Sequence, residues 1–142
     1  MSGSTKVYLD QVDNGYCFPV IQTMIGKDIL ENYARVMNSN IRFSSNSAPI
    51  VPPAAIASIT IGELLSSINL PPGSIHMSEE IISRSELEVG KKINVEVVLK
   101  NKSVREGYML ISLVFNIKNE ANTNSIIEAK TVLMIPQEST GE

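Results

Sequence analysis

The sequence predicts an α+β domain in which a long curved antiparallel sheet wraps around one central helix. Three observations predict this plan. Residues 52–68 have the composition of a helix that is apolar on nearly every face, which is typical of a helix surrounded by other elements. The second half of the chain alternates apolar and polar residues in four short runs, as antiparallel strands do. A strand-like segment and an amphipathic helix precede both features.

Length and composition indicate one globular domain. The chain has 142 residues, of which 43% are hydrophobic and 19% are charged, and this is enough to bury a single core. We expect one domain over 1–142, with flexible ends at 1–6 and 136–142. The net charge of −3 gives no reason to expect binding to nucleic acid or to an anionic membrane. No apolar run reaches the roughly 18 residues that a membrane-spanning helix needs.

A single cysteine and a single histidine limit the chemistry of the chain. Cys17 cannot form an internal disulfide, and residues 1–6 lack the apolar region of a secretory signal, so we expect a cytoplasmic protein. One Cys and one His are too few for a zinc site of ordinary ligands, and we expect neither a metal nor a cofactor. Cys17 has no histidine near it in the sequence, which favours a small buried side chain over a nucleophile.

The first third of the chain contains a strand-like segment and a helix. Residues 7–23 are strand-like, with a turn signal at Asp13-Asn14-Gly15. Residues 26–37 place apolar side chains three and four positions apart, in one stripe, and this predicts an amphipathic helix. The stripe consists of Ile29, Tyr33, Val36 and Met37. A loop then runs through Ser47.

The central helix is predicted to begin at Pro52-Pro53. Proline suits a first helical turn because its missing N–H would have no intrahelical partner there. The helix extends over 52–68 and is ended by the proline-containing segment 69–73. Glu63 is its only charged residue.

The strands are predicted from alternating apolar positions. The clearest runs, at 93–99 and 111–117, each place four apolar side chains on one face. A third run at 126–135 is rich in β-branched residues, and a weaker run lies at 74–82. Short connections between the runs indicate antiparallel pairing. With the central helix, this is the plan of the hotdog fold, whose open sheet edges lead us to expect pairing with a second subunit.

Three stretches resemble MaoC-like dehydratases and (R)-specific enoyl-CoA hydratases, which are hotdog proteins that act on acyl thioesters. They are "VDNGYCFP" followed by "IGKDILENYARVMNSN", then "PIVPPAAI" at the start of the central helix, then "SELEVGKKINVEVVL" before the sheet. Together they cover the chain from about Val12 to Ile135. The resemblance, which is to the dehydratase-like half of the superfamily, implies a role in fatty acid metabolism. It also implies a dimer and an acyl-CoA or acyl-carrier-protein thioester as ligand.

The catalytic signature of that family is degenerate in this chain. The resemblance implies Tyr-Ala, a short gap, and then an Asp and a His that activate the water added across the enoyl double bond. Tyr33-Ala34 match. One register then places Ser39 and Ser44 at the Asp and His positions, and the other places Asn38 and Phe43 there. None of these side chains has a pKa suited to moving a proton near neutral pH, so the resemblance to a lyase leaves enzymatic activity open.

Two other side chains are weak catalytic candidates. His76 is either a relocated acid–base group facing a pocket or a half-exposed strand histidine with a local hydrogen bond, and we favour the second interpretation. Glu63, if buried, would serve a hotdog thioesterase as nucleophile or general base, although we favour an exposed Glu63 near the end of its helix. The pair Glu79-Glu80 alternates across its strand, and we expect solvated charges at a strand end.

The start of the central helix is the expected binding site. Backbone N–H groups of Ala54 and Ala55 in the first turn are suited to bind a thioester carbonyl. Close packing of these small side chains against the sheet is the other interpretation. The remaining predicted substrate-binding residues come from the preceding segment, and they are Asn38, Ser39, Asn40 and Val51.

The sequence therefore predicts an accessory or non-catalytic hotdog subunit. The resemblance implies that such a subunit binds an acyl-CoA or acyl-carrier thioester, as a homodimer or as a heterodimer with a second hotdog subunit. Two alternatives stay open, namely an acyl-CoA thioesterase that uses Glu63 and a stand-alone acyl-binding or structural hotdog dimer.

Overall fold

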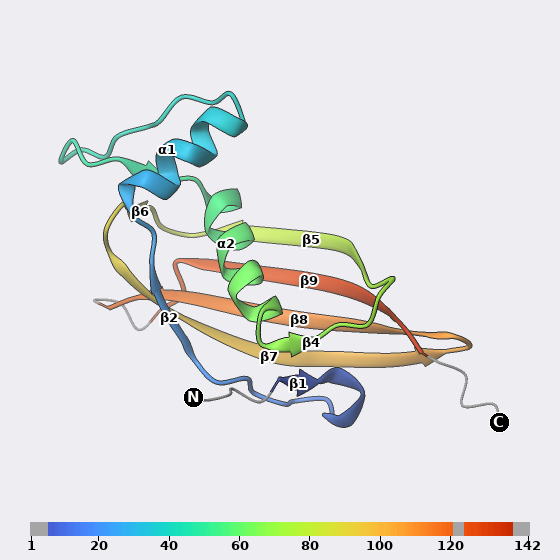
Figure 1. Ribbon diagram of the computed structural model, residues 1–142. Coiled ribbons are helices and arrows are strands. Elements are labelled where there is room, and N and C mark those ends of the chain that lie inside the picture. The colour runs from blue at the N-terminus through green and yellow to red at the C-terminus, as the bar shows by residue number, and fades with distance from the viewer. Residues whose placement is uncertain (1–5, 121–123, 138–142) are drawn as a thin grey trace, which may run out of the picture.

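The computed structural model describes residues 6–120 and 124–137. A five-stranded antiparallel sheet with the strand order β2-β7-β8-β9-β5 forms its main layer. The helix α2 (Pro53–Leu65) lies against one face of this curved sheet (Figure 1). The strands of the sheet are β2 (Ile21–Met24), β5 (Ile75–Ser83), β7 (Lys92–Arg105), β8 (Tyr108–Asn119) and β9 (Ile127–Pro136).

Shorter elements join the sheet to the helices. The helix α1 (Lys27–Val36) follows β2, and a 3-10 turn η1 (Leu9–Gln11) follows the first strand. Two small sheets complete the fold. One is the parallel pair β1 (Val7–Tyr8) and β4 (Ile68–Asn69), and the other is the antiparallel pair β3 (Ile50–Val51) and β6 (Leu87–Glu88).

The meander β7-β8-β9 confirms the strand prediction and extends it. In β8 every second residue from Met109 to Ile117 is buried, which is the alternation expected of a sheet with one face on the core. The strands β7 and β8 run beyond the predicted 93–99 and 111–117 as far as a turn at Glu106-Gly107. Gly107 adopts φ +85 in this turn, a conformation that glycine reaches without strain.

The prediction for the central helix was wrong in two respects. First, the helix ends at Leu65, because the hydroxyls of Ser66 and Ser67 donate to carbonyls of the last turn, and Ile68 lies in β4. Second, α2 is not surrounded on every face. Only one side of it lies on the sheet, and the opposite side exposes a row of small residues, namely Ala54, Ser58 and Gly62.

The apolar stripe predicted for α1 does not form its buried face. Leu30 and Ala34 are the buried residues of this helix. The predicted residues Ile29, Val36 and Met37 are instead 46%, 73% and 58% exposed. The helix packs on the core through Leu30 and Ala34, four residues apart, and through Tyr33, the one residue of the predicted stripe that is partly buried.

The predicted flexible ends lie mostly outside the described residues. Of the C-terminal segment 136–142, Pro136 ends β9, and the N–H of Gln137 donates to the carbonyl of Gly107 at 2.9 Å. Within residues 6–120 and 124–137, no helix is long and apolar enough to cross a membrane.

Candidate functional site

A cavity of about 510 Å³ lies where the chain enters α2. Its walls come from the end of α1, the segment that follows α1, β3, the start of α2, and the end of β5 with the chain just after it. The lining residues are Tyr33, Met37, Ser39, Asn40, Arg42, Ile50, Val51, Pro52, Pro53, Ile56, Ser83, Ser85 and Glu86.

The end of α1 directs the chain into this wall. Asn38 adopts φ +52, a left-handed conformation that asparagine tolerates better than most residues and that commonly follows a helix end. The N–H of Ser39 then donates to the carbonyl of Ala34 at 2.9 Å. This termination turns Ser39 toward the cavity and gives Asn38 a structural role.

The segment after α1 folds back on itself around Ser44. The hydroxyl of Ser44 accepts hydrogen bonds from the N–H groups of Asn46 and Ala48, each at 3.2 Å. The N–H of Ile50 donates to the carbonyl of Arg42 at 2.9 Å. These bonds close the loop and return the chain to β3 at the cavity wall.

The entrance of α2 presents backbone rather than side-chain donors. Pro52 is the N-cap residue and makes no side-chain cap. The N–H of Ile56 donates to the carbonyl of Pro52 at 3.1 Å, so the N–H groups of Ala54 and Ala55 precede the first intrahelical bond. Ala54 is exposed, and Ala55 is 1% exposed. Their neighbours Pro53 and Ile56 line the cavity.

The charged side chains that line the cavity lie at its rim. The side chains of Arg42 and Glu86 are 78% and 56% exposed, and Nη2 of Arg42 lies 3.7 Å from Oε2 of Glu86. An exposed ion pair of this kind contributes at most about 1 kcal/mol to stability. The titratable side chains among the lining residues are Tyr33, Arg42 and Glu86, and no Asp or His is among them.

The structure brings some of the predicted binding residues together. Three of them line the cavity, namely Ser39, Asn40 and Val51. The other three adjoin it in the chain without lining it, namely Asn38, Ala54 and Ala55. The cavity thus coincides with the predicted helix entrance.

The two catalytic candidates lie elsewhere. The exposed carboxylate of Glu63 accepts a hydrogen bond from the Thr23 hydroxyl at 3.0 Å. The side chain of His76 is 42% exposed, and its Nε2 lies 3.8 Å from Oε1 of Glu79. Neither Glu63 nor His76 lines the cavity at the start of α2.

Cys17 is exposed, so the expected burial of its side chain was wrong. Its neighbour Phe18 is 4% exposed and belongs to the core. The N–H of Phe18 donates to the carbonyl of Val97 at 2.9 Å, and the backbone of Cys17 forms an isolated antiparallel β-bridge with that of Val98. Residues 16–18 therefore run as an extended segment beside β7, and alternation turns Phe18 inward and Cys17 outward.

Sequence reasoning missed several lining residues. The pairing of β3 with β6 brings three of them to the cavity, namely Ser83, Ser85 and Glu86. No local sequence pattern indicates this association between distant segments. Arg42 did carry a signal, since it is the only charged residue between Arg35 and Glu63. An isolated charge in an otherwise neutral stretch next to a predicted binding site indicates a contact with solvent or ligand.

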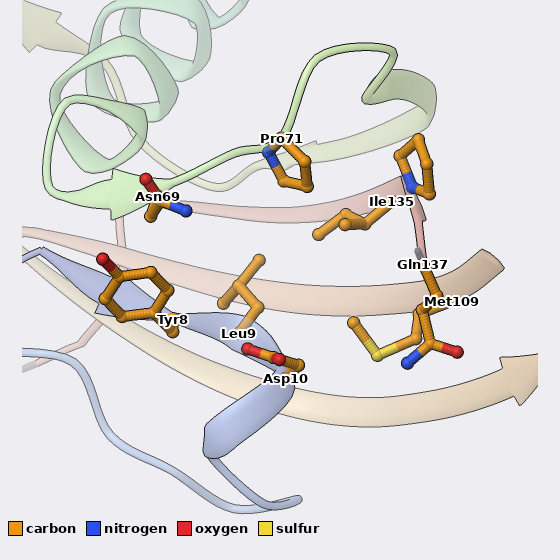
Figure 2. Close-up of a pocket in the computed structure, with 9 residues that line it drawn as sticks. Tyr8, Leu9, Asp10, Asn69, Pro71, Met109, Ile135 and Gln137 are labelled. Atoms are coloured by element: carbon orange, nitrogen blue, oxygen red, sulfur yellow. The ribbon is translucent and has the colours of Figure 1, made fainter. Parts of the chain in front are cut away.

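A second cavity, of about 440 Å³, lies beyond the other end of α2. Its buried floor consists of Leu9, Met109 and Ile135. Figure 2 shows Tyr8, Asp10, Asn69, Pro71 and Gln137 around these three side chains. No predicted site residue lines this second cavity.

Comparison with known proteins supports the fold. No protein-family model and no curated protein matches the sequence. Among solved structures, a MaoC-like dehydratase from Rhodospirillum rubrum is similar with a TM-score of 0.74 at 14% identity, over 94% of this chain and 99% of that chain. The (R)-hydratase from A. caviae is similar with a TM-score of 0.68 at 18% identity, over 89% of this chain and 98% of that one.

A third similar structure comes from a complex. It is the C-terminally truncated HadBC complex, a (3R)-hydroxyacyl-ACP dehydratase from Mycobacterium tuberculosis. Its TM-score is 0.68 at 15% identity, over 87% of this chain and 98% of that one. The chain therefore has the hotdog fold that MaoC-like dehydratases and (R)-hydratases share.

Proposed function

We propose that this chain is a non-catalytic or accessory hotdog subunit that binds an acyl-CoA or acyl-carrier thioester in the cavity at the start of α2. The observation that carries the proposal is the composition of that cavity. Its wall includes Ser39 and Asn40, from the segment that resembles the catalytic motif, yet its lining holds no Asp and no His.

The lining suits the two ends of an acyl thioester. Met37, Ile50 and Ile56 offer apolar contacts for an acyl chain. Arg42 at the rim has a guanidinium that is suited to the phosphates of coenzyme A or of a phosphopantetheine arm. Ser39 and Asn40 supply polar groups that can orient the thioester between these ends.

The lack of the family's Asp and His in the lining argues for binding without hydration, and the one carboxylate that lines the cavity, Glu86, is exposed at the rim beside Arg42. Hydration of an enoyl thioester needs groups that take a proton from water and deliver one to the substrate. From Asn32 through Gly62 the sequence contains no Asp, Glu or His. Glu63 is exposed, is hydrogen-bonded to Thr23 and does not line the cavity at the start of α2, which argues against the thioesterase alternative at this cavity.

The sheet edge supports pairing with a second hotdog subunit. β5 lies at one end of the strand order, and no described strand pairs with its outer side (Figure 1). Exposed edges of this kind are templates for pairing with another chain. Four apolar side chains of β5 are also at least 36% exposed, namely Ile75, Met77, Ile81 and Ile82. A cytoplasmic location remains a prediction from the sequence.

A tryptophan placed in the cavity tests the binding site. Ser39 is exposed and lines the cavity, so a Ser39→Trp variant is expected to fold and to fill the space. We expect the affinity for a short and a medium-chain acyl-CoA, measured by calorimetry, to fall at least about tenfold, which corresponds to ~1.4 kcal/mol.

The matched control is Asn46→Trp. Asn46 is exposed on the same loop and does not line the cavity, and we expect this variant to bind like the wild type. Equal affinities for Ser39→Trp and the wild type would place the ligand elsewhere and contradict the proposal.

A further inference from the structure

The second cavity, beyond the C-terminal end of α2, is separate from the proposed acyl site. The two cavities share no lining residue. The walls of the second one come from β1, η1, β4, the segment after β4, the start of β8, and the end of β9 with the residue after it. A ligand bound there would not compete directly with one at the start of α2.

The floor of the second cavity is apolar. Leu9, Met109 and Ile135 form it, and each is at most 3% exposed. The volume of about 440 Å³ lies within the range of small-molecule sites, which is about 300–1,000 Å³. An apolar group placed over this floor is removed from water, and this favours binding.

Hydrogen bonds hold the walls of the second cavity in place. Nζ of Lys102 donates to the carbonyls of Leu9 at 3.2 Å, of Asp10 at 3.4 Å and of Val12 at 2.5 Å. On the other side, the N–H of Gln137 donates to a carbonyl of the β7–β8 turn at 2.9 Å. A site whose walls are already fixed loses less conformational freedom when a ligand binds.

Asp10 is the only charged side chain that lines the second cavity. Figure 2 shows it beside Leu9 on η1. Among the described residues its carboxylate has no ion-pair partner. The ammonium of Lys102 bonds to three carbonyls, as many as its three donors allow. The charge at the cavity therefore attracts a cation and repels an anion.

Three uncharged residues of the lining also suit a cation. The ring of Tyr8 is 47% exposed and lines the cavity, and the face of an aromatic ring attracts an ammonium group. Asn69 and Gln137 line it as well, and their side-chain carbonyls can accept hydrogen bonds from such a group.

The carboxylate of Glu79 has a different setting. It was expected to be a solvated charge at a strand end, and this was wrong, because Glu79 lies in the middle of β5 and its side chain is 21% exposed. Its Oε1 lies 3.8 Å from Nε2 of His76, and Thr131 is opposite it on β9. Glu79 thus has a titratable group and a hydroxyl of its own chain beside it, and it lines neither of these two cavities.

We propose that the second cavity binds a small organic ammonium ion. Its apolar body would cover the floor of Leu9, Met109 and Ile135, and its charged group would lie beside Asp10. The apolar floor supplies affinity, and Asp10 selects the charge of the ligand. This site does not depend on acyl binding at the start of α2.

Three compounds with the same alkyl chain serve as probes, namely hexylammonium, hexanol and hexanoate. The protein is labelled with ¹³C in the methionine methyl groups, and each probe is titrated while the NMR signals are followed. Met109 is the only methionine that lines the second cavity, and Met37 is the only one that lines the first. Met109→Leu, a substitution of similar volume, assigns the Met109 signal.

We expect hexylammonium to shift the Met109 signal and to leave the Met37 signal in place. Its affinity should exceed that of hexanol about fivefold, because an exposed charge pair contributes only a modest free energy. Hexanoate should bind more weakly than hexanol. In Asp10→Asn the preference for hexylammonium should disappear, whereas the affinity for hexanol should be unchanged.

Asp13→Asn is the matched control. Asp13 is exposed, does not line the second cavity and gives the same change in net charge, so the preference for hexylammonium should persist. Hexanoate binding as tightly as hexylammonium would overturn the proposal, and so would a preference that survives in Asp10→Asn. A Met109 signal that none of the three probes moves at the limit of solubility would overturn it too.

The outcome is separable from that of the proposed function. An acyl-CoA titration of the same labelled protein is followed at Met37. Each cavity therefore has its own signal, and the failure of either proposal leaves the other to be decided by its own titration.

Discussion

The β7-β8-β9 meander and the segment 38–53 are specified by different kinds of signal. In the meander, alternation places one residue in two on the core, and Phe115, Leu113 and Ile111 are each at most 1% exposed. The segment 38–53 has no such repeat. It is held by bonds around Ser44 and by left-handed residues at Asn38 and Ser47.

The difference separates stability from recognition. The sheet contributes most of the free energy of unfolding, because its large apolar side chains are removed from water when the chain folds. The cavity instead takes much of its lining from a loop that buries few side chains and is free to vary in chemistry. Substitutions in the two regions should therefore affect different measurements.

The largest effect is expected in the meander. Phe115 is fully buried, so Phe115→Ala removes apolar contacts and leaves a cavity, with an expected loss of about 3–5 kcal/mol in the free energy of unfolding. Denaturant titration measures it. The control is Val114→Ala on the other face of β8, where the side chain is only partly buried, and its loss should be several-fold smaller. Equal losses would contradict the assignment of the core face.

A smaller effect is expected from two buried threonines. Thr60 is 0% exposed, and its hydroxyl donates to the carbonyl of Ile56 at 2.9 Å. Thr131 is equally buried, but its hydroxyl has no partner among the described residues. Thr131→Val should raise the free energy of unfolding by about 1 kcal/mol, whereas Thr60→Val should lower it by a similar amount.

Thermal melts of the two Thr→Val variants test whether their changes in stability have opposite signs. A loss of stability in Thr131→Val as large as that in Thr60→Val would show that the Thr131 hydroxyl has a partner in the isolated chain.

The smallest effect is expected at the cavity rim. Arg42→Ala should leave the melting temperature nearly unchanged, because its ion pair with Glu86 is exposed. Affinity for an acyl-CoA should fall a few-fold, whereas affinity for the corresponding acyl-pantetheine, which lacks phosphates, should not. Arg35→Ala is the control, since Arg35 is exposed on α1 and does not line the cavity. Equal losses for both ligands would remove the phosphate role of Arg42.

The sequence predicted the meander and the start of α2 because both follow local rules. Alternation marks the strands, and Pro52-Pro53 marks the first turn of the helix. The buried face of α1 escaped prediction because Ile29, Val36 and Met37 form a more apolar stripe than the pair Leu30 and Ala34 that packs on the core. Periodicity alone favoured the more apolar face of α1, but the packing of the helix on the rest of the protein determines which face is buried.

Only the part of the candidate site that is formed by the segment before α2 could be predicted from the sequence. Ser39, Asn40 and Val51 are near one another in the chain and next to a recognisable helix start, so local reasoning found them. Glu86 and its neighbours reach the cavity through the pairing of β3 with β6. The two-residue strands of that pair are too short for a periodic signal.

The most direct test of the central claim is an enoyl-CoA hydration assay with the purified chain. A short trans-2-enoyl-CoA is added at a concentration that saturates binding, and the loss of the conjugated enoyl absorbance is followed. The account predicts binding without turnover, because the cavity at the start of α2 is lined by no Asp and no His. Measurable hydration that disappears in a His76→Ala variant would contradict it and identify a catalytic histidine on β5.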